Sequence, residues 1–66
     1  MMDPLPRIDS ILIDRDRRLA IVDGAIMTVG DEVGPRTVAR IEPEAVFLRE
    51  PSGMEVRVPL RSGNPR

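Results

Sequence analysis

The sequence predicts an all-β domain of six short antiparallel strands, arranged as a small barrel or as two packed three-stranded sheets. Three observations support this fold class. The apolar residues fall in short β-branched runs separated by turn residues, an Asp-Gly pair splits two of these runs, and no window shows an apolar stripe of helical period. A chain of 66 residues forms one domain, and so few strands must curl or stack to cover their apolar faces.

The domain boundaries follow from the prolines and the turn residues. Residues 1–6 contain two prolines separated by one residue, which favours a disordered or extended leader. Residues 7–60 have the strand pattern of a small β-domain, and residues 61–66 have the polar composition of a flexible tail. The six strands are expected at residues 8–13, 19–22, 25–29, 37–42, 45–49 and 55–60.

The first three strands are joined by a charged turn and by a tight hairpin. Residues 8–13 are rich in isoleucine, which favours a strand, and the alternating charges of residues 14–17 end it. Asp23 and Gly24 separate the second and third runs by two residues. This is the pattern of a type I′ turn, because both of its central residues need positive φ.

The last three strands are joined by turns that contain proline or glycine. Residues 30–35 form a loop in which Val33 is the one residue expected to contact the core. A Pro-Glu pair at residues 43–44 forms the next turn, because the fixed φ of proline suits a type I turn. Gly53 allows a left-handed backbone in the last turn, and Pro59 ends the last strand or places it at an edge.

A core is predicted from the apolar residues that share one face of each strand. In residues 55–60 polar and apolar side chains alternate with a period of two, which assigns the two valines and Leu60 to the inner face. The predicted core residues are Ile11, Ile13, Leu19, Ile21, Ile26, Val38, Ile41, Val46, Leu48, Val56 and Val58.

The composition argues against several classes of function. Without Cys or His the chain has no thiol nucleophile, no zinc site of Cys or His ligands and no histidine base. All ten basic residues are arginine, and the formal net charge of −1 argues against nucleic-acid binding. We therefore expect no enzyme activity, no cofactor, no metal site and no nucleic-acid partner. The apolar runs are too short for membrane insertion, and the first residues lack the apolar core of a signal peptide.

The first strand is a candidate binding site for a protein partner. Ser10, Ile11, Leu12 and Ile13 form a strand that is apolar on both faces, although the first strand of a meander lies at an edge unless the barrel closes. An open edge can pair with a strand of a partner through main-chain hydrogen bonds. The alternative is that Leu12 packs under the proline-containing leader.

Two further features are candidates for the same site. Arg17 and Arg18 lie in or beside the charged turn, where they either form a solvated, self-neutralising tip with the neighbouring aspartates, as we favour, or recognise carboxylates. Phe47 is the only aromatic residue, and it points outward if its two neighbours along the strand point inward. An outward Phe47 is either a cap over a second small core or an interface anchor.

The order of turns and apolar residues resembles a known family. The resemblance depends on residues 11–13, the segment RRLAIVDG at 17–24, residues 29–31, the spacing of Gly34, Val38 and Ile41, and residues 42–49. From Ser10 to Leu60 the pattern is similar to the small periplasmic β-domain of pilus and secretion assembly proteins. This group includes MshK of MSHA pilus biogenesis, the C-terminal domain of GspB, the homology region of GspC, and PilP.

The resemblance implies a non-enzymatic interaction module of a type IV pilus or type II secretion assembly, built of two three-stranded sheets and located in the periplasm. Such a module docks on the N-terminal domain of a secretin or on another envelope component. Docking through a sheet edge, as in the GspC type, would use residues 10–13 here, with Arg17 and Arg18 nearby. The alternative function is a small SH3-like or OB-like nucleic-acid-binding barrel. The sequence gives no signal for an oligomeric state.

Overall fold

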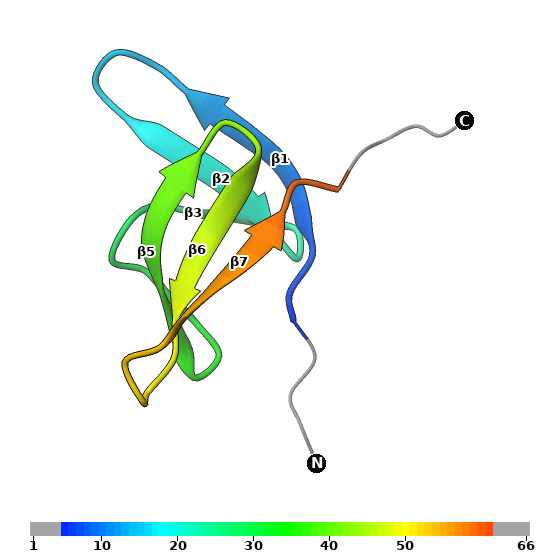
Figure 1. Ribbon diagram of the computed structural model, residues 1–66. Coiled ribbons are helices and arrows are strands. Elements are labelled where there is room, and N and C mark those ends of the chain that lie inside the picture. The colour runs from blue at the N-terminus through cyan, green and yellow to red at the C-terminus, as the bar shows by residue number, and fades with distance from the viewer. Residues whose placement is uncertain (1–4, 62–66) are drawn as a thin grey trace.

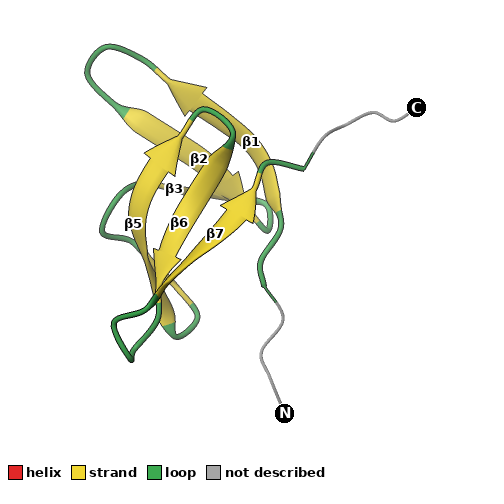
Figure 2. Ribbon diagram, in the orientation of Figure 1, coloured by secondary structure: helices red, strands yellow, loops and turns green. Residues whose placement is uncertain are grey.

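The computed structural model describes residues 5–61, which contain strands and no helix (Figure 1, Figure 2). The strands are β1 (Ile8–Ile13), β2 (Arg18–Val22), β3 (Ala25–Met27), β4 (Glu32–Val33), β5 (Arg36–Glu42), β6 (Ala45–Arg49) and β7 (Glu55–Pro59). Of the predicted leader only Leu5 and Pro6, and of the predicted tail only Arg61, belong to the described residues; the rest of both segments lies outside them.

The strands form two antiparallel sheets that pack face to face. Strands β1, β2 and β3 form a three-stranded sheet in chain order, and β4 to β7 form a four-stranded sheet, also in chain order. In Figure 1, β5, β6 and β7 lie in front of β2 and cross it. The all-β class and the packed sheets are thus confirmed, with seven strands in place of six and without closure into a barrel.

The additional strand lies in the segment that the sequence predicts as a loop. Val33 pairs with Arg36, so that Gly34 and Pro35 are the central residues of a hairpin between β4 and β5. Gly34 has a φ of 62°, which matches the first central position of a type II′ turn, and proline has the negative φ of the second position. The predicted contact of Val33 with the core is confirmed.

The Asp-Gly hairpin between β2 and β3 is also confirmed. Val22 pairs with Ala25, and Asp23 and Gly24 have φ values of 49° and 84°. Positive φ at both positions is the requirement of a type I′ turn. The Oδ1 atom of Asp23 accepts a hydrogen bond of 2.8 Å from the backbone N–H of Arg7, which ties the start of β1 to this turn.

The core lies between the sheets. Its buried side chains are Ile8, Ala20, Val22, Val38, Ile41, Ala45, Val46, Leu48 and Val58. The prediction for the four-stranded sheet is confirmed, because its assigned residues are buried or, for Val56, packed against the buried cluster. In β5 a bulge between Val38 and Arg40 brings both Val38 and Ile41 to the inner face.

In β2 and β3 the predicted core face is wrong. Ala20 and Val22 are the buried residues of β2, so Leu19 and Ile21 point to the outer face of the sheet. Ile26 pairs with Ile21 and is 67% exposed. Residues 19–22 are apolar at every position, and therefore their alternation does not distinguish the inner face from the outer one.

In β1 the predicted core is only partly right. Ile8, which the sequence did not assign to the core, is buried, and Ile11 packs against the buried cluster. Ile13 is 37% exposed, because the end of the β1–β2 hairpin extends past the four-stranded sheet (Figure 1). A bulge between Ile8 and Ser10 shifts the alternation, so that a single period does not describe the whole strand.

Candidate functional site

The outer face of the three-stranded sheet is apolar. The register pairs Leu12 with Leu19 and Ile21 with Ile26, and directly opposite side chains lie on the same face of a sheet. Leu12 is 59% exposed, Ile26 is still more exposed, and Leu19 and Ile21 are half-buried. With Ser10 these residues line a shallow groove of about 320 Å³. We call the five residues the apolar face.

Strand β1 contributes Ser10 and Leu12 to the apolar face and is an edge strand of its sheet. At its start, Ile8 forms a parallel bridge with Leu60, and the Ile8 C=O accepts a hydrogen bond of 2.9 Å from the N–H of Arg61. From Ser10 to Ile13, no residue within 5–61 pairs with β1 on the side away from β2. The edge is therefore covered at its start and open over its second half.

The leader does not cover Leu12 where it is described. Leu5 and Pro6 line a hollow together with Asp23 and Gly34, at the other end of β1. Residues 1–4 of the predicted leader lie outside the described residues.

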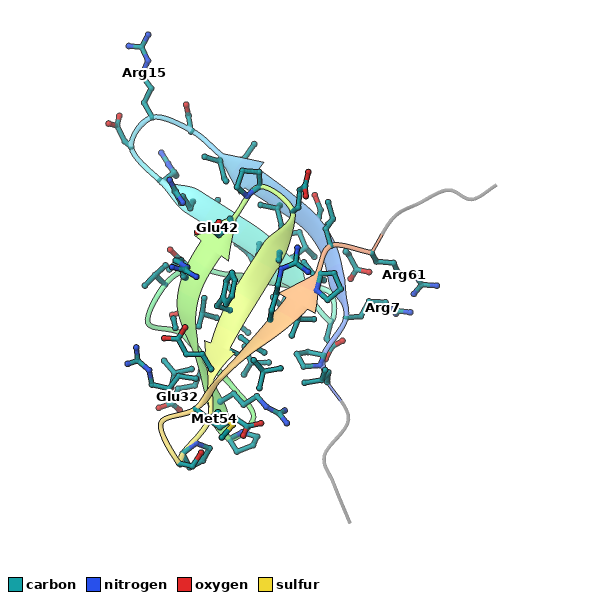
Figure 3. All side chains as sticks on the ribbon, viewed as in Figure 1. Arg7, Arg15, Glu32, Glu42, Met54 and Arg61 are labelled. Carbon is teal, nitrogen blue, oxygen red and sulfur yellow. The ribbon has the colours of Figure 1, made fainter. Side chains whose placement is uncertain are left out.

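The two candidate arginines have different surroundings. Nη1 of Arg18 donates a hydrogen bond of 2.7 Å to the backbone C=O of Ile41, which links β2 to the four-stranded sheet. Arg17 is exposed in the charged turn, where the neighbouring Arg15 points away from the body of the domain (Figure 3). Within the described chain neither Arg17 nor Arg18 forms an ion pair. Arg18 thus adds a hydrogen bond between the two sheets, whereas the Arg17 side chain forms no hydrogen bond or ion pair with another described residue.

Phe47 lies on the outer face of the four-stranded sheet, the orientation that strand alternation predicts. It pairs with Arg40 on one side and Arg57 on the other. The guanidinium carbon of Arg40 lies 4.2 Å from the centre of the Phe47 ring, which is a cation–π contact. The ring is half-buried and borders a hollow of about 210 Å³. Phe47 and the apolar face are on opposite sides of the molecule.

Charged residues cover the outer face of the four-stranded sheet. Nε of Arg40 lies 3.2 Å from a carboxylate oxygen of Glu42, and Nη2 of Arg49 lies 3.2 Å from one of Glu55. We call Arg40, Glu42, Phe47, Arg49, Glu55 and Arg57 the charged face. A further ion pair is more buried: Nε of Arg36 lies 3.3 Å from a carboxylate oxygen of Glu50.

The described residues hold no assembly of reactive groups. They contain no group of three or more His, Cys, Asp or Glu side chains that could hold a metal ion. The hydroxyl of Thr28 donates to the backbone C=O of Arg18 at 3.1 Å, and the hydroxyl of Ser52 accepts from the N–H of Met54 at 3.4 Å. The Thr28 hydroxyl therefore links the end of β3 to the start of β2, and the Ser52 hydroxyl serves the β6–β7 turn. No helix in residues 5–61 is long and apolar enough to cross a membrane.

Sequence reasoning missed three residues of the apolar face. Of its five residues, the sequence places Ser10 and Leu12 at a binding site and assigns Leu19, Ile21 and Ile26 to the core. One signal was available, since a run of four apolar residues at 19–22 contains more apolar side chains than one buried face can use. No family model, curated protein or solved structure matches this chain.

Proposed function

We propose that this protein is a non-enzymatic protein-interaction module that docks a partner protein on the apolar face. The observation that supports the proposal most is the exposure of Leu12 and Ile26 on either side of a groove with an apolar floor. Contiguous exposed aliphatic side chains are typical of protein-interaction sites. A partner that covers these side chains removes apolar area from water, and this burial stabilises a complex by about 25 cal/mol per Å².

The arrangement of the apolar face is that of a small binding site. Leu19 and Ile21 form its half-buried floor, and Leu12 and Ile26 form its two walls. An aliphatic or aromatic side chain of a partner fits such a groove as an anchor, and anchors in desolvated pockets provide most of the energy of an interface. Ser10 and the charged turn border the groove, as a polar rim borders most interfaces.

The resemblance of the sequence pattern supplies the class of partner. We propose the N-terminal domain of a secretin, or another assembly protein of a type IV pilus or type II secretion system, in the periplasm. Ser10, Leu12 and the exposed Arg17 belong to the proposed contact. Arg18 and Phe47 do not, because Arg18 is engaged with Ile41 and Phe47 lies on the charged face.

The arginines do not favour the nucleic-acid-binding alternative. Such a barrel would present an uncompensated stripe of arginines to phosphates. On the charged face, Arg40 and Arg49 each contact a glutamate, and the sheets do not close into a barrel.

A binding experiment with one disruptive variant and one matched control tests the proposal. The immobilised full chain is titrated with purified secretin N-terminal domains and pilus assembly proteins up to high micromolar concentration. Leu12→Asp should abolish binding and leave the circular dichroism spectrum unchanged. Met54→Asp should bind like the native chain, since Met54 is 66% exposed but lies in the β6–β7 turn, at the far end of the molecule from Arg15 (Figure 3).

Two results would contradict the proposal. One is that no candidate partner binds the native chain at high micromolar concentration. The other is that Leu12→Asp and Met54→Asp bind equally. If Leu12→Asp unfolds the chain, the same test is made with Ile26→Asp, which places the charge on the opposite wall of the groove.

A further inference from the structure

The open half of β1 directs unpaired main-chain groups outward. The N–H of Asp14 donates a hydrogen bond of 2.8 Å to the C=O of Arg17. These residues follow β1 and precede β2, so they extend the β1–β2 ladder by one hydrogen-bonded pair. Hydrogen-bonded and non-hydrogen-bonded pairs alternate along an antiparallel ladder. Leu12 therefore bonds to β2, and Ile11 and Ile13 direct their N–H and C=O groups away from the sheet.

These outward groups are complementary to themselves. If a second copy of β1 runs antiparallel beside the first, with a two-fold axis through Leu12 perpendicular to the sheet, Ile11 lies opposite Ile13 of the second copy. Both residues direct their main-chain groups toward the neighbour, so the pair exchanges both of its N–H···O bonds. The two-fold axis repeats this exchange at Ile13, and no outward group of either residue is left without a partner.

The apolar side chains match in the same register. Leu12 faces Leu12 of the second copy on the outer side, and Ile11 packs against Ile13 of the second copy on the inner side. Ile13 is the inward-facing residue that the four-stranded sheet leaves exposed. Cross-strand pairs of β-branched and aliphatic side chains stabilise a sheet, so the second copy covers what the fold leaves uncovered.

The polar side chains that flank this centre are also complementary. The register places Ser10 opposite Asp14 of the second copy, where the hydroxyl can donate to the carboxylate. Next to this pair, Asp9 of one copy comes beside Arg15 of the other, which is exposed at the end of the hairpin (Figure 3). The Asp9 carboxylate already lies 3.2 Å from Nε of Arg7 in its own chain, so Arg15 would join this pair. Like charges directly opposite each other would destabilise such a ladder, and this register brings none together.

The geometry points to a homodimer in which the β1 strands of two copies pair antiparallel about Leu12, from Ser10 to Asp14, to form one continuous six-stranded sheet. The covered start of β1, where Leu60 and Arg61 occupy the edge, limits the pairing to this half. Residues 62–66 contain a proline but no Ala, Val, Ile, Leu, Met or Phe, and they are a poorer match for this edge than β1 itself. If the proposed function holds, the dimer joins two apolar faces into one broad docking surface.

Concentration-dependent sedimentation of the isolated full chain tests the dimer without any partner. The interface is smaller than a standard one, and we expect a dissociation constant on the order of 100 μM. The mean mass should rise from 7.4 kDa toward twice that value between about 10 μM and 1 mM, a range that spans this constant. A mean mass that stays at 7.4 kDa over this whole concentration range would overturn the inference. This holds both if the edge stays open and if the chain's own tail covers it.

Ile13→Pro tests the pairing of the edge. Proline removes the outward N–H of residue 13, which bonds to no other described residue, and Ile13→Val keeps it. Because the two-fold axis doubles each lost bond, Ile13→Pro should weaken dimerisation at least about tenfold, whereas Ile13→Val should stay close to native. Circular dichroism first shows that both variants are folded. Equal dissociation constants for the two folded variants would overturn the inference.

Cross-linking tests the position of the two-fold axis. The chain has no Cys, so a single introduced thiol reports on one position. Non-hydrogen-bonded antiparallel pairs have Cα atoms about 4.5 Å apart, within the range of a disulfide. Leu12→Cys should form a covalent dimer on oxidation, and Ile26→Cys, at least as exposed but on β3, should not. Efficient cross-linking of Ile26→Cys would instead indicate face-to-face stacking or pairing through β3, the other edge strand of this sheet, and would overturn the inference. A dimer in the absence of partner binding would refute the proposed function alone.

Discussion

The two outer faces of this domain differ in whether their exposed side chains contact other residues of the same chain. On the charged face, Phe47 lies beneath Arg40, and Arg40 and Arg49 each contact a glutamate of the same chain. On the apolar face, Leu12 and Ile26 have large exposed surfaces with no described residue above them. Both faces cover the same core, so the need to fold does not explain the difference.

The difference supports the proposal that the apolar face is the docking surface. A face whose charges are paired internally gains little from a further contact, because exposed ion pairs are already solvated and screened. An aliphatic face gains from every contact that removes water.

The largest contrast is expected between two leucines. Leu48→Ala should lower the free energy of unfolding by about 2–5 kcal/mol, because the fully buried side chain leaves a cavity. Leu12→Ala should change it by no more than about 0.5 kcal/mol, as expected for a surface position. Urea denaturation measures both values. A large loss in Leu12→Ala would show that Leu12 belongs to the core and would remove the apolar face from the comparison.

A smaller effect is expected at the hairpin that joins β2 to β3. Gly24 has a φ of 84°, and a Cβ added there meets nothing within 4 Å, so the cost of a side chain comes from the backbone alone. Gly24→Ala should lower the free energy of unfolding by about 1–2 kcal/mol. Gly24→Asn is the control, because asparagine tolerates this conformation and should lose less. Equal losses in thermal denaturation would contradict this explanation.

The cation–π contact on the charged face should contribute less. A double-mutant cycle of Arg40→Ala and Phe47→Leu should give a coupling of about 0.5–1 kcal/mol, because the guanidinium over the ring is largely exposed to solvent. Chemical denaturation of the four proteins provides the measurement. A coupling of zero would mean that Arg40 does not stabilise Phe47, and this part of the contrast between the two faces would be wrong.

The smallest effect is expected for an exposed ion pair. Arg49 and Glu55 are about half exposed, and Arg49→Gln should change stability by only about 0–1 kcal/mol, with the difference falling as salt is added. Denaturation at low and high salt measures it. A loss that salt does not reduce would show that packing of the Arg49 stem, and not its charge, stabilises the charged face.

Much of the fold was predictable because local rules determine it. Asp23 and Gly24 predicted the hairpin from turn geometry alone, and the alternation in β7 predicted its inner face. The Gly34–Pro35 hairpin was missed, since glycine and proline occur in many loops and β4 is only two residues long.

The candidate site was predictable only in part. Leu12 was placed at a surface because an apolar first strand at an edge is unusual. Leu19 and Ile21 were placed in the core because a run without polar residues carries no period, and which face of β2 is buried depends on the packing of the other sheet. The contact of Arg18 with Ile41 spans the two sheets, and no local pattern could indicate it.

Nuclear magnetic resonance shows directly which of the two faces a bound partner contacts. The labelled full chain is titrated with the secretin N-terminal domain or pilus assembly protein that binds it most tightly. The largest shift changes should occur at Leu12, Leu19, Ile21 and Ile26, with Arg40, Phe47 and Arg49 unchanged. Changes concentrated on the charged face, with the apolar face unaffected, would contradict the claim that the apolar face is the docking surface.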